Sequence, residues 1–271
     1  MPVRIDVLTT FPELFAATPP GVLGVSIPSR AIAAGALSVH ATNIRDFTTD
    51  KHQKTDDRPF GGGPGMVMMC QPLWDAVMAA EGRDDVVPPR PARRILLTPQ
   101  GVPLTQELVE RLALEPRLLM IAGHYEGLDE RVIQKLDPVE ISIGDYVLSG
   151  GELGALVLID AIARLLPGVL GDQASSSQDS FSSFTLQTSK PSSKRSKAAA
   201  STGPVAARLL DCPHYTKPRE WMGLTIPDVL LSGDHAKIEA WRLAQRVERT
   251  RQRRPDILPE PKPEHGTPPT A

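Results

Sequence analysis

Three glycine-bearing loops stand out because each one directly follows a short apolar run. They are Leu97–Gly101, Gly123–Gly127 and Ile143–Gly151. In parallel α/β sheets, ligands bind outside the carboxyl ends of the strands, where free backbone amides and carbonyls can hydrogen-bond a small molecule. One such loop is usually only a tight turn, but three in succession indicate a shared crevice. The sequence therefore predicts a small-molecule site lined by these three loops.

A fourth glycine-rich segment, Asp56–Met66, reads DDRPFGGGPGM. Consecutive glycines between prolines let a ligand approach the backbone more closely than side chains would permit. The guanidinium of Arg58 in this segment suits a phosphate, which it can hold with two hydrogen bonds. A plain flexible turn is the alternative interpretation, and an isolated glycine run does not decide between the two.

Several common kinds of site lack their residues in this chain. No GxGxxG follows a predicted strand and no GxxxxGK[ST] is present, which argues against dinucleotide-dependent hydride transfer and nucleotide hydrolysis. The six histidines show no HExxH or paired metal spacing. Cys70 and Cys212 are the only cysteines, too few for a disulfide framework or a four-cysteine zinc site, and we interpret Cys70 as a small core residue.

The elements that must carry these loops alternate between β-rich runs and helical stretches. Short apolar and β-rich runs predict five strands, at residues 3–8, 37–44, 94–97, 118–122 and 139–143. Helical spacing of apolar residues predicts helices at residues 72–81, 105–114 and 150–166. This alternation indicates the α/β class, with a parallel sheet flanked by helices on both faces.

The composition is typical of a soluble chain with a real core. The 271 residues are 41% hydrophobic and 23% charged, which argues against wholesale disorder, and the 4% aromatic content predicts an aliphatic core. The first residues do not have the pattern of a signal peptide. The longest apolar run, Leu153–Leu166, is interrupted by charges and too short to span a bilayer. We therefore expect a cytoplasmic protein without a membrane partner.

Charge and composition change in the last third of the chain. Residues 1–189 carry 15 basic and 23 acidic side chains, whereas residues 190–254 carry 14 basic and 6 acidic ones, which indicates a polyanionic partner for the second part. A solvated charged surface is the alternative, and charge alone does not separate RNA from DNA. Residues 174–202 are runs of Ser, Lys and Ala that predict a mobile linker. Residues 226–253 have helical spacing, with Asp234 opening the most regular stretch, and a proline-rich tail follows.

Seven motifs, in order along the chain, closely resemble those of the bacterial tRNA (guanine(37)-N1)-methyltransferases. They are DDRPFGGGPGM, GHYEGLDERV, SIGDYVLSGGE, PGVLG, DSF, LLDCPHYTKP and VLLSGDHAKIEAWR, and the resemblance runs from about Val3 to Arg254. It implies the SPOUT class, in which an α/β domain contains a deep trefoil knot and a smaller helical domain follows. General rules of topology would not have predicted a knot. The resemblance also implies a homodimer with active sites at the subunit interface, a tRNA containing G37 as partner, and activity that needs Mg²⁺.

On this basis we expect four parts. They are a SPOUT-type domain that binds S-adenosylmethionine at residues 1–172, a flexible Ser/Lys/Ala-rich linker at 173–207 with the catalytic aspartate at its start, a helical tRNA-binding domain at 208–254, and a disordered proline-rich tail at 255–271. In most relatives known to us, DSF leads almost directly to the LLDCPHYT segment. The extra residues 182–203 of this chain are therefore a departure from the family pattern.

The reaction that the resemblance implies is transfer of a methyl group from S-adenosyl-L-methionine to N1 of guanine 37 in the tRNA anticodon loop. Asp179, in the DSF motif, matches the family's catalytic aspartate and is expected to remove the N1 proton as a general base. Arg164 matches the family's essential arginine and is expected to stabilise charge at O6. From the residues alone, Asp179 is an ordinary loop acid or helix cap, and Arg164 suits a helix C-terminus.

The expected binding residues follow from the same motifs. Those expected to bind the cofactor are Leu97, Pro99, Gln100, Gly123, Tyr125, Glu126, Ile143, Gly144, Asp145, Tyr146, Val147, Leu148, Gly150 and Gly151. Those expected to contact RNA are Arg58, His214, Lys217, Arg219 and Arg246. Glu126 suits either the ribose hydroxyls or the ammonium group of the cofactor. Two other functions stay open, a SPOUT methyltransferase for another RNA position and a non-catalytic RNA-binding relative.

Overall fold

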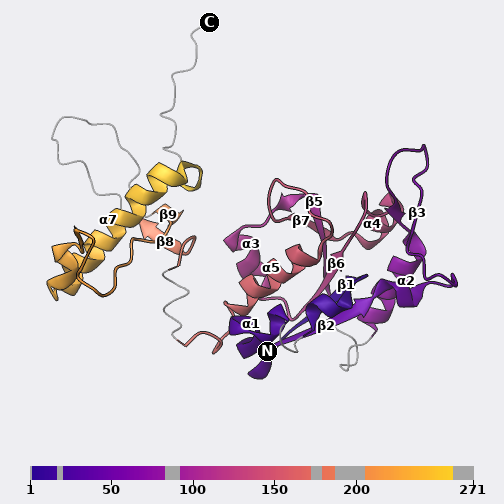
Figure 1. Ribbon diagram of the computed structural model, residues 1–271, viewed down its shortest axis with the longest axis horizontal. Coiled ribbons are helices and arrows are strands. Elements are labelled where there is room, and N and C mark those ends of the chain that lie inside the picture. Colours follow the sequence, from indigo (N-terminus) through magenta and orange to yellow (C-terminus); the bar gives the residue numbers. More distant parts are fainter. Residues whose placement is uncertain (1, 17–20, 83–91, 172–178, 187–204, 259–271) are drawn as a thin grey trace, which may run out of the picture. The chain divides into compact units, whose positions relative to one another are not determined.

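A computed structural model describes residues 2–16, 21–82, 92–171, 179–186 and 205–258. The chain divides into two compact units, Met1–Gln173 and Ala174–Ala271, and each is described here by itself. Figure 1 labels the helices and strands of both units. Within the described residues, no helix is both long enough and apolar enough to cross a membrane.

The first unit is built on a five-stranded sheet in which every paired neighbour runs parallel, in the order β2-β1-β6-β5-β7. The strands are β1 (Val3–Thr9), β2 (Leu37–Asn43), β5 (Arg93–Pro103), β6 (Arg117–Ala122) and β7 (Val139–Ser142). All six residues of the central β6 are buried. Strands with such continuous burial must be covered on both faces. The predicted α/β class and parallel sheet flanked by helices are therefore confirmed.

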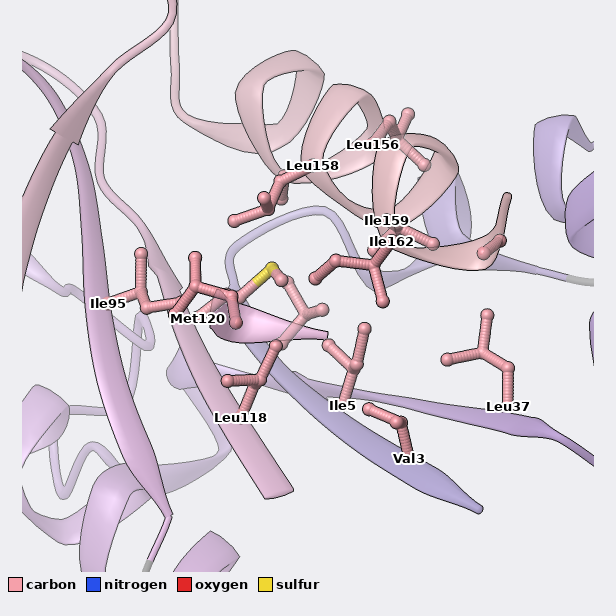
Figure 2. Close-up of a cluster of buried hydrophobic side chains, with 14 of the residues drawn as sticks. Val3, Ile5, Leu37, Ile95, Leu118, Met120, Leu156, Leu158, Ile159 and Ile162 are labelled. Atoms are coloured by element: carbon pink, nitrogen blue, oxygen red, sulfur yellow. The ribbon is translucent and has the colours of Figure 1, made fainter. Parts of the chain in front are cut away.

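Helices cover both faces of this sheet. They are α1 (Ser26–Ala33), α2 (Cys70–Glu81), α3 (Gln106–Leu112), α4 (Glu130–Leu136) and α5 (Glu152–Ala163). Alternate strand residues face opposite layers, so Leu118 and Met120 of β6 pack in a core with α1, α3 and α5, whereas Leu119 and Ile121 pack in a second core with α2 and α4. Figure 2 shows apolar side chains of α5 directed at the sheet in the first core.

Short elements complete the first unit. They are the 3₁₀ helices η1 (Pro12–Phe15), η2 (Val22–Gly24) and η3 (Ile44–Phe47) and the antiparallel pair β3 (Asp56–Asp57) and β4 (Val67–Met68). Side-chain caps set where two helices begin. Thr105 Oγ1 accepts from the Leu108 N–H before α3, and Asp129 Oδ1 accepts from the Arg131 N–H before α4.

The start of the second unit differs from the predicted linker at 173–207. Two strands, β8 (Ser183–Leu186) and β9 (Val205–Arg208), pair antiparallel. Their backbone N–H and C=O groups bond to each other in a segment for which the composition predicted no strands. The alternation Ser-Phe-Thr-Leu of β8 is only four residues long, and the surrounding Ser/Lys/Ala-rich composition outweighed it in the prediction. Residues 172–178 and 187–204 of the predicted linker lie outside the described residues.

The rest of the second unit contains one long helix, α7 (His235–Arg253). The other elements are the hairpin of β10 (Glu220–Trp221) and β11 (Leu224–Thr225), and the 3₁₀ helices η4 (Asp228–Leu231) and η5 (Pro255–Ile257). The predicted helical region began at residue 226, but α7 begins at His235 because Asp234 Oδ1 accepts from the Lys237 N–H as its cap. Most of the predicted tail, residues 259–271, lies outside the described residues.

Candidate active site

A bulge inside β5 and the loops at the carboxyl ends of β6 and β7 line one cavity of about 370 Å³, together with the start of α5. Thirteen of the fourteen residues expected to bind a cofactor lie on its wall. They are Leu97, Pro99, Gln100, Gly123, Tyr125, Glu126, Ile143, Gly144, Tyr146, Val147, Leu148, Gly150 and Gly151. Asp145 is exposed and is not part of the wall. The convergence expected of three loops at one sheet edge is thus present in the first unit.

The first wall comes from an irregularity inside β5. Leu97 and Val102 both pair with Ile141 of β7, so residues 98–101 leave the ladder and bulge out. Thr98, Pro99 and Gln100 thereby reach the cavity. A Cβ at Gly101 would lie 2.6 Å from the Glu140 carbonyl oxygen, which explains why this bulge returns to the sheet through a glycine.

The second wall is the turn after β6. Tyr125 and Gly127 have φ angles of +62° and +129°, which reverse the chain tightly. The Glu126 N–H donates to the Met66 carbonyl (3.0 Å), and the Met68 N–H donates to the Gly127 carbonyl (2.9 Å). These bonds tie the turn to the end of the glycine-rich segment that carries Arg58. Burial, and next a hydrogen bond with Asp56, raises the pKa of Tyr125, which therefore stays a neutral phenol at physiological pH.

The third wall is the segment between β7 and α5. The Ser142 hydroxyl donates to the Gly144 carbonyl (3.0 Å), and the Tyr146 hydroxyl donates to the Ile143 carbonyl (3.2 Å), so the segment is held by its own side chains. Its end returns to the β6 turn, where the Gly151 N–H donates to the Gly123 carbonyl (2.9 Å). The second and third walls are therefore joined directly.

Sequence reasoning missed two side chains next to this cavity, His124 and Glu152. His124 lies on the cavity wall, and its Nε2 is 2.8 Å from both carboxylate oxygens of Glu152, the first residue of α5. One signal was available in the sequence. Glu152 is a charged residue at the start of a mostly apolar helix, and a buried carboxylate requires a partner.

The two residues expected to be catalytic belong to different units. Arg164 is the C-cap of α5 in the first unit, where α5 also supplies Gly154 to the cavity wall. Asp179 lies in the second unit, at the start of a turn in which its carbonyl accepts from the Ser182 N–H (3.2 Å) and hydroxyl (2.6 Å). Arg164 and Asp179 thus come from different compact units of the chain.

Four of the five residues expected to contact RNA are exposed: Arg58, His214, Lys217 and Arg219. Arg246 is different, because it is only 4% exposed. Its Nη2 donates to Asp211 Oδ1 (3.0 Å), and its guanidinium lies 4.5 Å from the centre of the Phe184 ring. Arg246 faces the interior of the second unit because it lies on the inner side of the amphipathic α7, so its position is that of a packing residue.

Within the described residues, Asp211, Cys212 and His214 hold atoms capable of binding a metal within 4.8 Å of one another. Asp211 already accepts hydrogen bonds from His214 and from Arg246, and the positive charge of Arg246 disfavours a cation there. Burial, and next the nearby Asp211 carboxylate, raises the pKa of Cys212 and keeps it a thiol, which is the weaker metal ligand. This cluster is better explained as a group of hydrogen bonds that attaches Asp211 to α7.

The chain is similar to a family of known proteins over most of its length. The model of the family described as "tRNA (Guanine-1)-methyltransferase TrmD" matches residues 3–260. Relatives named tRNA (guanine-N(1)-)-methyltransferase occur in Rhodopirellula baltica (48% identity over 259 residues, 95% of each chain), Shewanella loihica (50% over 254 residues, 94% of this chain and 90% of the relative) and Brevibacillus brevis (48% over 256 residues, 94% and 91%). The family match runs through both compact units.

Proposed function

Because the chain belongs to the tRNA (guanine-1)-methyltransferase family, we propose that it transfers a methyl group from S-adenosyl-L-methionine to N1 of guanine 37 in the anticodon loop of tRNA. The methylation of guanine N1 in tRNA rests on the family and on the names of the relatives. The methyl donor, position 37 and the role of each residue are the content of the proposal. The observation that carries it is that the β5 bulge and the ends of β6 and β7 line one shared cavity.

The cavity fits the proposed donor in size and in chemistry. Its volume of about 370 Å³ falls within the range of small-molecule sites. Leu97, Ile143 and Leu148 offer apolar surface for a flat adenine, and the loop backbones offer hydrogen bonds for its edge. The Glu126 carboxylate suits the ribose hydroxyls or the ammonium group. When bound, S-adenosylmethionine supplies an electrophilic methyl group on its sulfonium.

The proposed chemistry requires a base and a charge-stabilising donor. The Asp179 carboxylate accepts the N1 proton of guanine, which leaves N1 nucleophilic and moves negative charge toward O6. The Arg164 guanidinium donates to O6 and stabilises that charge. Because α5 carries both Arg164 and part of the cavity wall, one helix positions this arginine relative to the donor site. No observation supports the expected Mg²⁺, and no step is assigned to it.

The target base must leave its stack to enter such a cavity, which favours an unpaired loop nucleotide. We assign the phosphate contacts to the exposed Arg58, His214, Lys217 and Arg219. For Arg246 we propose a supporting role instead, since it holds Asp211 inside the second unit. Its exposed neighbours on α7, Arg251 and Arg253, are the better candidates for RNA contact.

The finer architecture also belongs to this proposal. The expected boundaries at 172 and 254 are retained, with a trefoil knot in the first domain and a helical tRNA-binding domain expected at 208–254. The boundary at 207 falls inside β9, which pairs with β8. The bond between Gly151 and Gly123 supports the knot, because it brings the segment after β7 back beside the β6 turn. The exposed Leu153 and Val157 on α5 support a homodimer, since a second copy would cover them.

Labelled S-adenosylmethionine and two tRNA transcripts that differ only at position 37 test the reaction. Label should enter the G37 transcript and not its A37 counterpart. Asp179→Ala should reduce kcat by about 10²- to 10⁴-fold while the Kd for the donor stays within about twofold, because a general base acts after binding. Label in the A37 transcript would instead support a methyltransferase for another position. No label in any RNA would favour a non-catalytic binder.

A further inference from the structure

A buried polar cluster extends inward from the wall of the cavity, where one of its members, His124, lines the cavity. It consists of Thr9, His124 and Glu152, which we call the Thr9–Glu152–His124 network. Thr9 is fully buried and Glu152 is 4% exposed, and the exposed fraction of the His124 side chain is 15%. The three residues come from the end of β1, the turn after β6 and the first turn of α5. A carboxylate at this depth is costly unless its oxygens are hydrogen-bonded.

The hydrogen bonds of this network join all three side chains through Glu152. The Phe11 N–H donates to Thr9 Oγ1 (2.9 Å), so the Thr9 hydroxyl donates its own proton to Glu152 Oε1 (2.5 Å). His124 Nε2 lies 2.8 Å from both oxygens of Glu152, so one proton lies between the imidazole and the carboxyl group. Glu152 therefore holds both Thr9 and His124 from the first turn of α5.

The network is joined to the cavity wall at several points. His124 forms an isolated antiparallel bridge with Gly150, and a Cβ at Gly150 would overlap the His124 ring. On the other side, the ring of Phe11 lies 5.1 Å from that of His124. His124 also stands between Gly123 and Tyr125, which both line the cavity. Any rotation of the His124 ring would therefore move the second and third walls together.

We propose that Thr9, Glu152 and His124 are positioning residues for the methyl donor. This inference rests on the proposed function, since it takes S-adenosylmethionine as the occupant of the cavity. Glu152 fixes the orientation of the His124 ring, and the ring fixes how the β6 turn meets the end of the segment after β7. His124 lines the cavity, whereas Thr9 and Glu152 do not, so we assign the three residues a contribution to donor binding and not to proton transfer.

The polar character of the network is the reason to assign this role. A trio of apolar side chains would fill the same space with comparable stability, because a buried ionic pair is rarely more favourable than a packed apolar one. What the polar network adds is direction, since the hydrogen bond requires His124 Nε2 to point at the carboxyl group of Glu152. A requirement for fixed loop geometry explains why the sequence keeps a carboxylate in this interior position.

Isothermal titration of the full chain with S-adenosylmethionine, combined with steady-state kinetics, tests the proposal. His124→Leu and Thr9→Val each remove one hydrogen bond to Glu152, and we expect Kd and KM for the donor to rise about tenfold or more. The KM for tRNA and the kcat at saturating donor should change less than threefold.

His124→Gln should recover donor affinity to within about threefold of the parent, because its amide can donate from the place of Nε2. Exposed His40 provides the matched control, and His40→Gln should leave the donor Kd unchanged.

The outcomes separate this inference from the function on which it rests. If the unaltered chain does not bind S-adenosylmethionine, the proposed function fails. If the unaltered chain binds it and His124→Leu and Thr9→Val bind it equally well, the positioning role fails and the proposed function stands. A loss of donor affinity that His124→Gln does not recover would also overturn the hydrogen-bond argument. A lower urea midpoint with an unchanged donor Kd in the folded variants would make the network purely structural.

Discussion

Two glycines on the cavity wall are required for different reasons. Gly144 has φ +151°, a backbone conformation that other residues rarely adopt. Gly151 has φ −77°, which any residue adopts, so its requirement is one of space. A Cβ at Gly151 would lie 2.8 Å from the Ala122 Cα and 3.1 Å from the Gly123 nitrogen. These are backbone atoms, which cannot rotate away as a side chain can.

Gly151→Ala should therefore damage the cavity by steric overlap alone, because alanine adopts the backbone angles of Gly151 without strain. We expect the added methyl group to push the start of α5 away from the β6 turn and to weaken donor binding about tenfold or more, as overpacking of a tight contact does. Titration with S-adenosylmethionine measures the effect. Gly82→Ala is the matched control, because Gly82 has φ −74° and its added Cβ would meet an atom only at 3.4 Å. Equal donor affinity in the two variants would contradict the argument.

At the scale of elements, the sequence predicts what depends on local pattern. β1 and β6 were predicted within one residue because buried strands of a parallel sheet are continuous apolar runs. The three glycine-bearing loops were expected to meet because parallel strands end at one edge. The bulge inside β5 was not predicted, since it depends on how Leu97 and Val102 pair with another strand. Pairing of β8 with β9 depends on distant partners in the same way.

Side chains whose role depends on a partner far along the chain were also missed. The sequence does not show that α5 places the Glu152 carboxyl group against the His124 imidazole. Arg246 was expected to contact RNA because it lies in the basic second part of the chain. Its burial becomes understandable only once Asp211 and Phe184 are seen to receive its guanidinium. Local pattern thus locates the cavity, whereas contacts distant in sequence decide which charged groups support it.

The contact between Asp211 and α7 provides a prediction of pH dependence. Burial would raise the pKa of Asp211, but hydrogen bonds from His214, the Cys212 N–H and Arg246 outweigh it and hold that pKa below its ordinary value. A carboxyl whose pKa is lowered by folding stabilises the folded state above its unfolded pKa of about 3.9. That stabilisation is lost as the pH falls through the lower folded value.

Asp211→Asn should accordingly destabilise the second unit by about 1–3 kcal/mol at pH 7, because it weakens the partner of the buried Arg246. The difference from the parent should shrink as the pH falls below about 4. Urea unfolding in a Trp74→Phe, Trp221→Phe background measures it, since Trp241 on α7 is then the remaining tryptophan. Asp228→Asn, in the same unit, is the control. A difference that is constant with pH would contradict the assignment.

At the scale of the whole molecule, the uneven charge of the chain has a functional consequence. Residues 187–204 connect β8 to β9 and carry four basic side chains, Lys190, Lys194, Arg195 and Lys197. We call this segment the basic strap. Its flexibility stays a prediction from composition, but its charge is fixed by the sequence. Because tRNA is a polyanion, each phosphate contacted by the strap would release bound counterions and make binding more sensitive to salt.

Two variants separate the charge of the strap from its length. The first replaces residues 187–204 with Asn-Gly, a two-residue turn that suits the antiparallel pairing of Leu186 with Val205. The second keeps the full length and changes the four basic residues to serine. We expect both to weaken tRNA binding at low salt and to reduce the slope of log K against log salt by about 0.7–0.9 per lost contact, with kcat at saturating tRNA unchanged.

A slope equal to that of the parent in both variants would exclude the strap from the RNA interface. A loss of kcat in the shortened variant alone would show that Asp179 depends on the length of the connection rather than on its charge.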